Sequence, residues 1–387
     1  MPRDGGRSLL KSDLKIGIVC HPTYGGSGVV ATELGLALAG RGHRIHFVSH
    51  ALPFRLPEAY PNTVFHEVDV TSYPLFKYPP YTLALAGRLV DLCRQEMLDV
   101  IHVHYAIPHA VAAYLCRQVL GSPVPKIVTT LHGTDISLIG IDPSFYEITR
   151  FGINKSDAVT AVSRNLASET EVSFRPDVKI QVISNFIDTE VFTPALRDPE
   201  VRAAHADPCE MLVGHLSNFR QVKRIPDVIR TFHLLQRKVP ARLLMIGEGP
   251  ELESARHLAA ELGVSMRVSF LGAVAQAASI LAQLDLFLLT SETESFGLAA
   301  LEAMACGVPV ICTKAGGIPE IVAEGTGILC PVGDYAAMAR AGASILLDRG
   351  RLESMRAAAR SHAVTRFPKE AIVSEYEDLY RTVIAGS

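Results

Sequence analysis

Short apolar runs of strand length alternate with amphipathic stretches along the first half of the chain. The first run, Lys15–Cys20, leads into a glycine-rich segment, a helical pattern over Val29–Gly40 and a second strand at Arg44–Ser49. Further strands are expected at Val64–Val68, Val100–Val103, Lys126–Thr130 and Ala158–Val162. Strands that alternate with helices predict a parallel sheet with helices on both faces.

The same alternation starts again after Phe192. Strands are expected at Glu210–Ser217, Arg242–Ile246, Val268–Leu271, Leu286–Thr290 and Val308–Cys312, and helices at Ile225–Lys238 and Gln276–Leu284. A chain of 387 residues also exceeds what one core usually holds. We therefore predict an α/β fold with two Rossmann-like, doubly wound domains. The predicted segments are a lead at 1–14, domains at 15–192 and 209–366, a polar linker at 193–208 and a C-terminal helix within 367–387 that crosses back to the first domain.

Composition narrows the class of protein. The chain is 48% hydrophobic and 20% charged, with a formal net charge of −3, so it has no basic field for nucleic acid. No run of about 18 apolar residues occurs, and we expect no membrane partner. The seven scattered cysteines include no C-x-x-C pair. This pattern favours a cytoplasmic protein over a disulfide framework or a zinc site.

Two glutamates, Glu294 and Glu302, stand eight positions apart on either side of a predicted helix start. Gly297 begins that helix, and Gly307 followed by Pro309 ends it. The free N–H groups of its first turn suit an anion, and carboxylates beside them suit sugar hydroxyls. Glutamates at this spacing also occur on ordinary amphipathic helices, so the pair alone leaves both interpretations open.

Three other groups are candidates for binding. The loop Gly25–Gly28 follows the first strand, where glycines allow a phosphate to approach the backbone, although a tight turn needs them too. It lacks the dinucleotide fingerprint G-x-G-x-x-G, which disfavours a dehydrogenase. Ser217–Arg224 is a basic loop that could bind a diphosphate or lie solvated. His102 and His104 share a strand face, but no third ligand follows, so we expect no metal site.

The segment from Glu294 to Glu302, which continues into Gly307–Val310 and Gly316–Glu320, resembles the E-x7-E motif of family-4 retaining glycosyltransferases. The resemblance implies the GT-B architecture, with two domains that face a central cleft. It also implies that Glu294 contacts the donor sugar and that Glu302 holds the ribose. The residues Ser295, Phe296, Gly297 and Leu298 would meet the sugar and diphosphate.

Further roles follow from the same resemblance. Gly25, Gly26, Ser27 and Gly28 would cap the diphosphate, Gly247 and Gly249 would meet the nucleobase, and His132 would orient the sugar. Lys223 matches the family's diphosphate-binding lysine. The family's arginine is missing, because the strand ends in Gly214-His215. We assign its role to Arg220, and His215 is the alternative.

A more particular resemblance points to the branch of this family that joins N-acetylglucosamine to L-malate, the first step of bacillithiol biosynthesis. It rests on Phe76–Tyr81, His104–Ala110, Thr129–Asp135 and Arg150, together with Ser217–Arg224. It implies UDP-N-acetylglucosamine as donor, L-malate as acceptor and no metal or other cofactor. Lys77, Tyr105, Thr130 and Arg150 would bind the acceptor. An inositol phosphate, lipid or glycan acceptor, a non-catalytic regulator that binds sugar nucleotides, and a homodimer all stay open.

Overall fold

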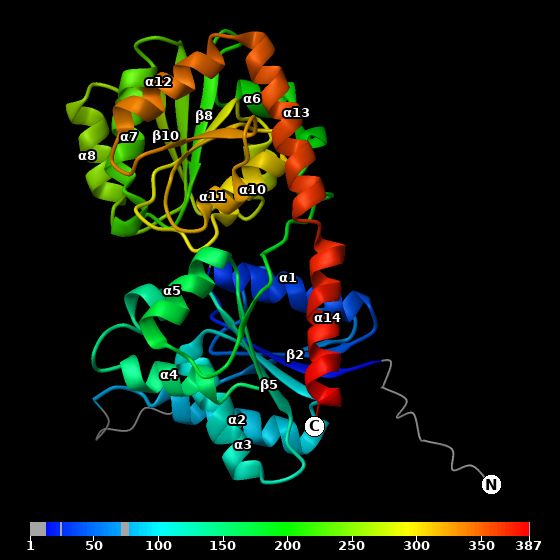
Figure 1. The fold of residues 1–387 in the computed structure, drawn as a ribbon. Coiled ribbons are helices and arrows are strands. Elements are labelled where there is room, and N and C mark those ends of the chain that lie inside the picture. Colours follow the sequence, from blue (N-terminus) through cyan, green and yellow to red (C-terminus); the bar gives the residue numbers. More distant parts are fainter. Residues whose placement is uncertain (1–12, 24, 71–76, 387) are drawn as a thin grey trace. The chain divides into compact units, whose positions relative to one another are not determined.

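The computed structural model describes residues 13–23, 25–70 and 77–386, which form two compact units, each on its own sheet (Figure 1). The first unit comprises the described residues of Met1–Val162, Leu166–Ile183 and Val373–Ser387. The second comprises Ser163–Asn165 and Ser184–Ile372. The predicted lead at 1–14 lies outside the described residues except for its last two positions.

The first unit contains a seven-stranded parallel sheet in the order β3-β2-β1-β4-β5-β6-β7. Its strands are β1 Lys15–Val19, β2 Arg44–Ser49, β3 Thr63–Glu67, β4 Val100–His104, β5 Lys126–Leu131, β6 Ala158–Ala161 and β7 Ile180–Val182. Its helices are α1 Gly26–Gly40, α2 Tyr81–Glu96, α3 Val111–Leu120, α4 Tyr146–Asn154, α5 Arg164–Phe174 and α14 Lys369–Ala385, with helical turns η1 Ala106–Ala110 and η2 Thr134–Leu138.

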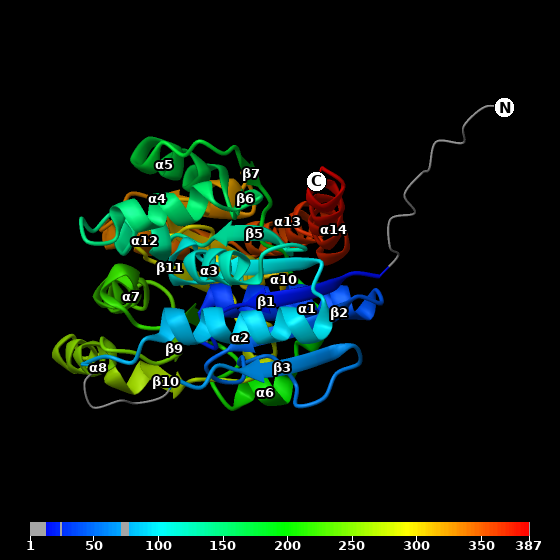
Figure 2. The ribbon, with the colours of Figure 1, turned by 90° about the horizontal axis from the view of Figure 1, so that it is seen from below.

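Alternate residues of these strands face two different layers, because successive side chains of a strand point to opposite faces. Val19, Val48 and Ile101 pack with α2 and α3 in one apolar cluster. On the other face, Phe47 lies under α1 and His102 contacts α14. Figures 1 and 2 show these helices on opposite sides of the sheet. The C-terminal helix therefore completes one layer of the first unit.

The second unit contains a six-stranded parallel sheet in the order β10-β9-β8-β11-β12-β13. Its strands are β8 Met211–Leu216, β9 Ala241–Ile246, β10 Val268–Gly272, β11 Leu286–Leu289, β12 Val310–Thr313 and β13 Gly327–Cys330. Its helices are α6 Pro199–Ala203, α7 Ile225–Leu235, α8 Leu252–Glu261, α9 Ala277–Leu281, α10 Leu298–Ala305, α11 Ile318–Ile321, α12 Tyr335–Leu346 and α13 Arg349–Arg366, with turns η3 Pro194–Leu196, η4 Gln221–Lys223 and η5 Ser265–Arg267.

The core of the second unit lies mainly between the sheet and the layer formed by α7, α8 and α12. Helix α10 packs on the other face, against β11, β12 and α13. All strands in each sheet run the same way, so their carboxyl ends meet at one edge. The chain order reverses between β1 and β4 in one sheet and between β8 and β11 in the other, and ligands of such folds bind at these points.

The predicted α/β class with two doubly wound parallel sheets is confirmed. Two edge strands, β7 and β13, were not predicted. Strand β7 has three residues, one of them an exposed glutamine, and β13 begins with a glycine. The predicted linker contains η3 and α6, which Thr193 and Asp198 cap ahead of prolines.

Candidate active site

Glu294 follows β11 and is held by two side chains of the second unit. Its Oε1 lies 2.6 Å from Nζ of Lys223 and 2.8 Å from Oγ of Ser291. Thr290 Oγ1 donates to the carbonyl oxygen of Lys223 at 2.8 Å, and this bond joins the loop after β11 to η4. The ion pair is partly buried, so it loses less strength to solvent than a surface pair does.

Two glycines fix the backbone of Glu294. Gly317 N–H donates to its carbonyl oxygen at 2.7 Å. A Cβ on Gly316 would lie 2.0 Å from that same oxygen, so a side chain there would displace the loop. The Gly316-Gly317 step therefore places the carboxylate of Glu294 beside the start of α10.

Helix α10 begins as the sequence predicts. Gly297 is its N-cap with a φ of +98°, and the helix runs from Leu298 to Ala305. Glu302 lies one turn into α10 and is buried. An aligned helix carries a partial positive charge at its N-terminus, so the first turn of α10 can accept an anion.

The other predicted donor-site glycines have a local packing role. A Cβ on Gly247 would lie 1.8 Å from Ser217 O, and one on Gly249 would lie 2.2 Å from Asn218 O. The loops after β8 and β9 therefore lie in close contact. Contact of these glycines with a nucleobase stays a prediction.

His215 does not offer a ring nitrogen to a ligand. It is buried at the end of β8, with Nδ1 bonded to Leu288 O and Nε2 bonded to Ser217 Oγ. Burial lowers the pKa of His215 to about 4, so its ring is neutral at pH 7. Arg220 is exposed at the N-cap of η4 and keeps the predicted role of the family arginine.

In the first unit, aromatic and histidine rings gather at the carboxyl edge of the sheet. The ring centroid of His21 lies 4.4 Å from that of His109 and 5.2 Å from that of Tyr105. His132 Nε2 lies 2.8 Å from His104 Nδ1, and its ring stands 5.4 Å from Tyr105. We call these five residues the ring cluster. Sequence reasoning named His132 and Tyr105 but gave His21 and His109 no role.

Asp135 orients the backbone of the ring cluster. Its carboxylate accepts the N–H groups of Ala106 at 2.8 Å, Gly133 at 2.9 Å and His132 at 3.2 Å. Tyr105, immediately before Ala106, has a φ of +101°, a strained conformation for a residue with a side chain. Burial raises the pKa of Asp135 to about 6, although the three amides oppose that shift.

Burial keeps the ring cluster uncharged at neutral pH. It lowers the pKa of His132 and of His109 to about 3 and that of His21 to about 4. The pKa of His104 falls further below its usual range for the same reason. Neutral imidazoles can both donate and accept hydrogen bonds, so the cluster suits hydroxyls and does not itself supply positive charge.

Thr130 belongs to a buried network. Its hydroxyl contacts His102 Nε2 at 2.7 Å, Thr160 Oγ1 at 2.7 Å and the hydroxyl of Tyr376 at 3.4 Å. His102 Nδ1 lies 2.8 Å from the hydroxyl of Tyr380. Strands β4 and β5 therefore turn both side chains toward α14, and the acceptor role of Thr130 stays a prediction.

The contacts of the two predicted acceptor cations are with residues outside the ring cluster. Lys77 is exposed, with Nζ 5.4 Å from the ring centroid of Tyr78. Arg150 lies on α4, with Nη2 4.0 Å from Asp177 and with a buried Nε that has no partner among the described residues. The structure joins neither cation to Tyr105, so their acceptor role stays a prediction.

The first turn of α1, which contains most of the predicted glycine loop, bonds to the ring cluster. Ser27 Oγ lies 2.8 Å from the hydroxyl of Tyr105. A Cβ on Gly28 would lie 2.6 Å from His21 O, so the close approach of α1 to the segment after β1 requires glycine here. Across the described ranges, no group of three or more acidic, histidine or cysteine residues is placed to hold a metal ion. The helices described here also include none long and apolar enough to span a bilayer.

Two family models cover most of the chain. The model described as "Glycosyltransferase Family 4" matches residues 24–191, and the model "Glycosyl transferases group 1" matches residues 199–362. The chain is also 49% identical over 372 residues to N-acetyl-alpha-D-glucosaminyl L-malate synthase of Bacillus anthracis, across 96% of this chain and 97% of that protein. The chain belongs to the family-4 glycosyltransferases.

More distant members of this glycosyltransferase family have other acceptors in their names. The D-inositol 3-phosphate glycosyltransferase of Segniliparus rotundus is 28% identical, over 94% of this chain and 85% of that protein. Among solved structures, Anabaena HepE in complex with UDP-glucose matches with a TM-score of 0.80 at 20% identity, covering 95% of this chain and 100% of that one. That likeness supports the GT-B fold of this glycosyltransferase.

Proposed function

We propose that this enzyme transfers N-acetylglucosamine from UDP-N-acetylglucosamine to the hydroxyl of L-malate, with retention at the anomeric carbon. The observation that carries the proposal is the 49% identity, over nearly the full length of both chains, to the Bacillus anthracis synthase. The product is the first intermediate of bacillithiol biosynthesis, which we place in the cytoplasm. Six of the seven cysteines are buried and none is paired, which fits a reducing compartment.

On the donor side, the second unit supplies both charges and amides. Lys223 and Arg220 neutralise the diphosphate, and the first turn of α10 adds its backbone N–H groups. Glu294 contacts the sugar, and Glu302 accepts the ribose hydroxyls. The preformed contact of Glu294 with Lys223, at 2.6 Å, supports a site in which a carboxylate and a cation are already aligned.

On the acceptor side, the ring cluster binds hydroxyl groups, and the two cations bind the carboxylates of the acceptor. Neutral His132 donates a hydrogen bond to the transferred sugar, and Tyr105 binds the malate hydroxyl or a carboxylate oxygen. Malate carries two carboxylates, so it needs cationic partners, and Arg150 and Lys77 supply them. The buried, unpartnered Nε of Arg150 supports a bound anion there.

The reaction needs no protein nucleophile in this scheme. The bond from the anomeric carbon to the β-phosphate oxygen breaks, and the malate hydroxyl oxygen bonds to that carbon on the same face. The proton of the malate hydroxyl passes to the departing β-phosphate, and UDP leaves. Positioning and charge stabilisation are then the protein's contribution, and the chemistry assigns no role to a metal.

UDP release from UDP-N-acetylglucosamine, measured with and without L-malate, tests the proposal. We expect malate to stimulate release by about tenfold or more, because water is a poorly positioned substitute acceptor. Mass spectrometry should then find a glucosaminyl-malate product. If inositol phosphate and not malate stimulates UDP release, malate is not the acceptor and an inositol phosphate is. If the donor binds but no turnover occurs, the protein is better described as a regulator that binds sugar nucleotides.

A further inference from the structure

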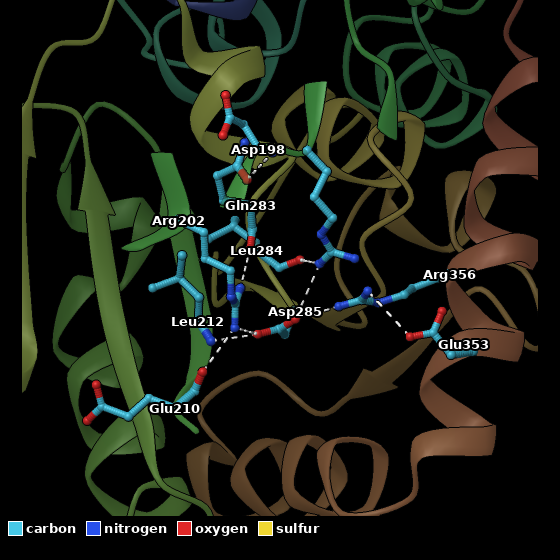
Figure 3. Close-up of polar contacts among 10 residues, drawn as sticks. Asp198, Arg202, Glu210, Leu212, Gln283, Leu284, Asp285, Glu353 and Arg356 are labelled. Atoms are coloured by element: carbon cyan, nitrogen blue, oxygen red, sulfur yellow. Dashed lines mark hydrogen bonds and ion pairs between the residues drawn. The ribbon is translucent and has the colours of Figure 1, made fainter. Parts of the chain in front are cut away.

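Three arginines converge on one carboxylate at the amino edge of the second sheet, opposite the donor-site loops (Figure 3). Asp285 precedes β11 and accepts Arg202 from α6 and Arg356 from α13, with Arg202 Nη2 at 2.7 Å from Oδ2. Arg197 Nη2 lies 3.3 Å from Oδ1, and the amide of Leu212 donates to Oδ2 at 2.8 Å. Both oxygens of Asp285 are therefore fully occupied.

Several guanidinium donors around Asp285 are left over. Arg356 Nε is buried and has no hydrogen-bond partner among the described residues. Arg197 forms its side-chain bonds through Nη2 alone, to Leu284 O and Asp285. Arg349, at the start of α13, makes no ion pair with any residue that the structure describes. Arg197 and Arg349 are exposed, so of these three arginines only Arg356 has an unsatisfied buried donor. Such a donor costs about 1–3 kcal/mol, so a ligand that accepts the N–H of Arg356 Nε would be favoured.

Positive charge exceeds negative charge in this region. The charged residues that line one cavity here are four arginines, Arg197, Arg202, Arg349 and Arg356, and three carboxylates, Glu210, Asp285 and Glu353. Four cations against three anions leave an excess of one positive charge. Burial lowers the pKa of Arg197, and the nearby positive charge of Arg356 lowers it further. Cations that lie close together each disfavour the charged form of the other.

These arginines line a cavity of about 370 Å³, together with Cys209 and Met211. That volume lies within the range of small-molecule pockets. Guanidinium groups bind the oxygens of phosphates and carboxylates in pairs, with matching geometry. We propose that this arginine-lined cavity of the second unit binds a small oxyanion, a phosphate or a polycarboxylate, at a site separate from the donor site.

A bound oxyanion would join two segments that meet here. Arg197 and Arg202 come from the segment before β8, and Arg349 and Arg356 come from α13. An anion that accepts from both would stabilise the folded second unit by RT ln(1 + [L]/Kd). The cavity lies at the opposite edge of the sheet from Lys223 and Glu294, so UDP and this anion bind independently.

Cys209 offers a local measure of occupancy. It lines the cavity and is exposed, whereas the other six cysteines, all within the described residues, are buried. The rate at which iodoacetamide alkylates Cys209 can be followed by mass spectrometry of its peptide. Inorganic phosphate and citrate are the two probes, each titrated at constant ionic strength against chloride, which separates specific binding from screening. We expect saturable protection of about fivefold or more by at least one probe, unchanged by UDP.

Matched variants test whether the arginines are responsible for the protection of Cys209. Arg197→Gln combined with Arg349→Gln should raise the probe concentration that gives half-protection by about tenfold or more, because two guanidinium groups of the cavity lining are lost. Arg351 lies on the same helix but outside the cavity lining, so Arg351→Gln should change the half-protecting concentration by less than about twofold. Circular dichroism checks that each variant is folded. Absence of saturable protection by both probes, equal protection in the double variant, or loss of protection on adding UDP would each overturn the proposal.

Discussion

Glu294 and Glu302 come from one motif but occupy different surroundings. Glu294 already has a cation, Lys223, and a hydroxyl, Ser291, within 2.8 Å of one oxygen. Glu302 is buried on α10, where its carboxylate keeps a fixed position one turn from the helix start. A preordered carboxylate loses little rotamer freedom when it binds hydroxyls, so Glu302 suits a ribose.

Glu302→Gln should raise the KM for UDP-N-acetylglucosamine by about tenfold or more, because hydrogen bonds to a charged group contribute about 1.5–3 kcal/mol. The KM for malate should change by less than about twofold. Steady-state kinetics with each substrate varied in turn measures both constants. Glu292→Gln is the control, since Glu292 is exposed in the same loop. An unchanged donor KM would contradict the ribose role.

Sequence reasoning found residues whose chemistry is carried by a local motif and missed those whose role depends on tertiary contact. Glu294 and Glu302 were identified because their spacing around a helix start, with the sequence between and after them, resembles the E-x7-E motif. Asp135 could not be assigned, because its partners include Ala106, 29 positions away. The buried network around Thr130 was missed for a similar reason. Its partner Tyr376 lies 246 positions further along the chain, which no local pattern reveals.

Helix α10 is an element whose start determines the candidate site. Gly297 holds a φ of +98°, which lets the chain turn from the loop of Glu294 into the first helical turn. A Cβ at this position would lie 3.1 Å from Ile321 Cδ1, so a side chain would meet α11 as well. Both conformation and packing therefore require glycine here.

Gly297→Ala should lower the free energy of unfolding by about 1–2 kcal/mol, because the left-handed conformation disfavours a side chain. It should also lower kcat/KM for the donor, since the amides of the first turn shift. Thermal unfolding and donor kinetics measure the two effects. Gly87→Ala is a control inside α2, where a Cβ meets nothing within 4 Å. That variant should be neutral or stabilised by about 0.5–1 kcal/mol. Equal effects of both substitutions would contradict the argument.

Elements with a long apolar core were predictable, and those defined by pairing alone were not. Strand β2 has the predicted bounds Arg44–Ser49, because five buried residues end at a polar turn. Strand β7 has one buried residue among three and exists through its pairing with β6. Edge strands of this kind carry too few side chains to show a period.

At the scale of the whole molecule, buried histidines are distributed unevenly. Among the described residues, five histidines are buried in the first unit, and one, His215, is buried in the second; the five are His43, His46, His102, His104 and His109. Burial lowers the pKa of His102 and His109 to about 3 and that of His46 to about 4. The unfolded chain therefore binds more protons than the folded chain between about pH 4 and 6.5.

The stability of the first unit should fall as the pH drops from 6.5 toward 4.5. Each such histidine removes about 1.4 kcal/mol per pH unit, because it must be protonated on unfolding but not in the fold. Asp135, with a raised pKa of about 6, contributes with the opposite sign but is one group against several. Urea unfolding at pH 7, 6 and 5, with hydrogen exchange to separate the units, measures the effect. Equal acid sensitivity in both units would contradict it.

Because α14 belongs to the first unit, the two units are completed at different stages of synthesis. The second unit is built mainly from one uninterrupted stretch, Ser184–Ile372, and has all of that stretch before the ribosome reaches Val373. The first unit waits for Tyr376 and Tyr380, which bond to Thr130 and His102. The half of the enzyme that is translated first is thus completed last. A nascent chain that stalls before α14 would expose an open layer of the first sheet, which is the kind of surface that chaperones bind.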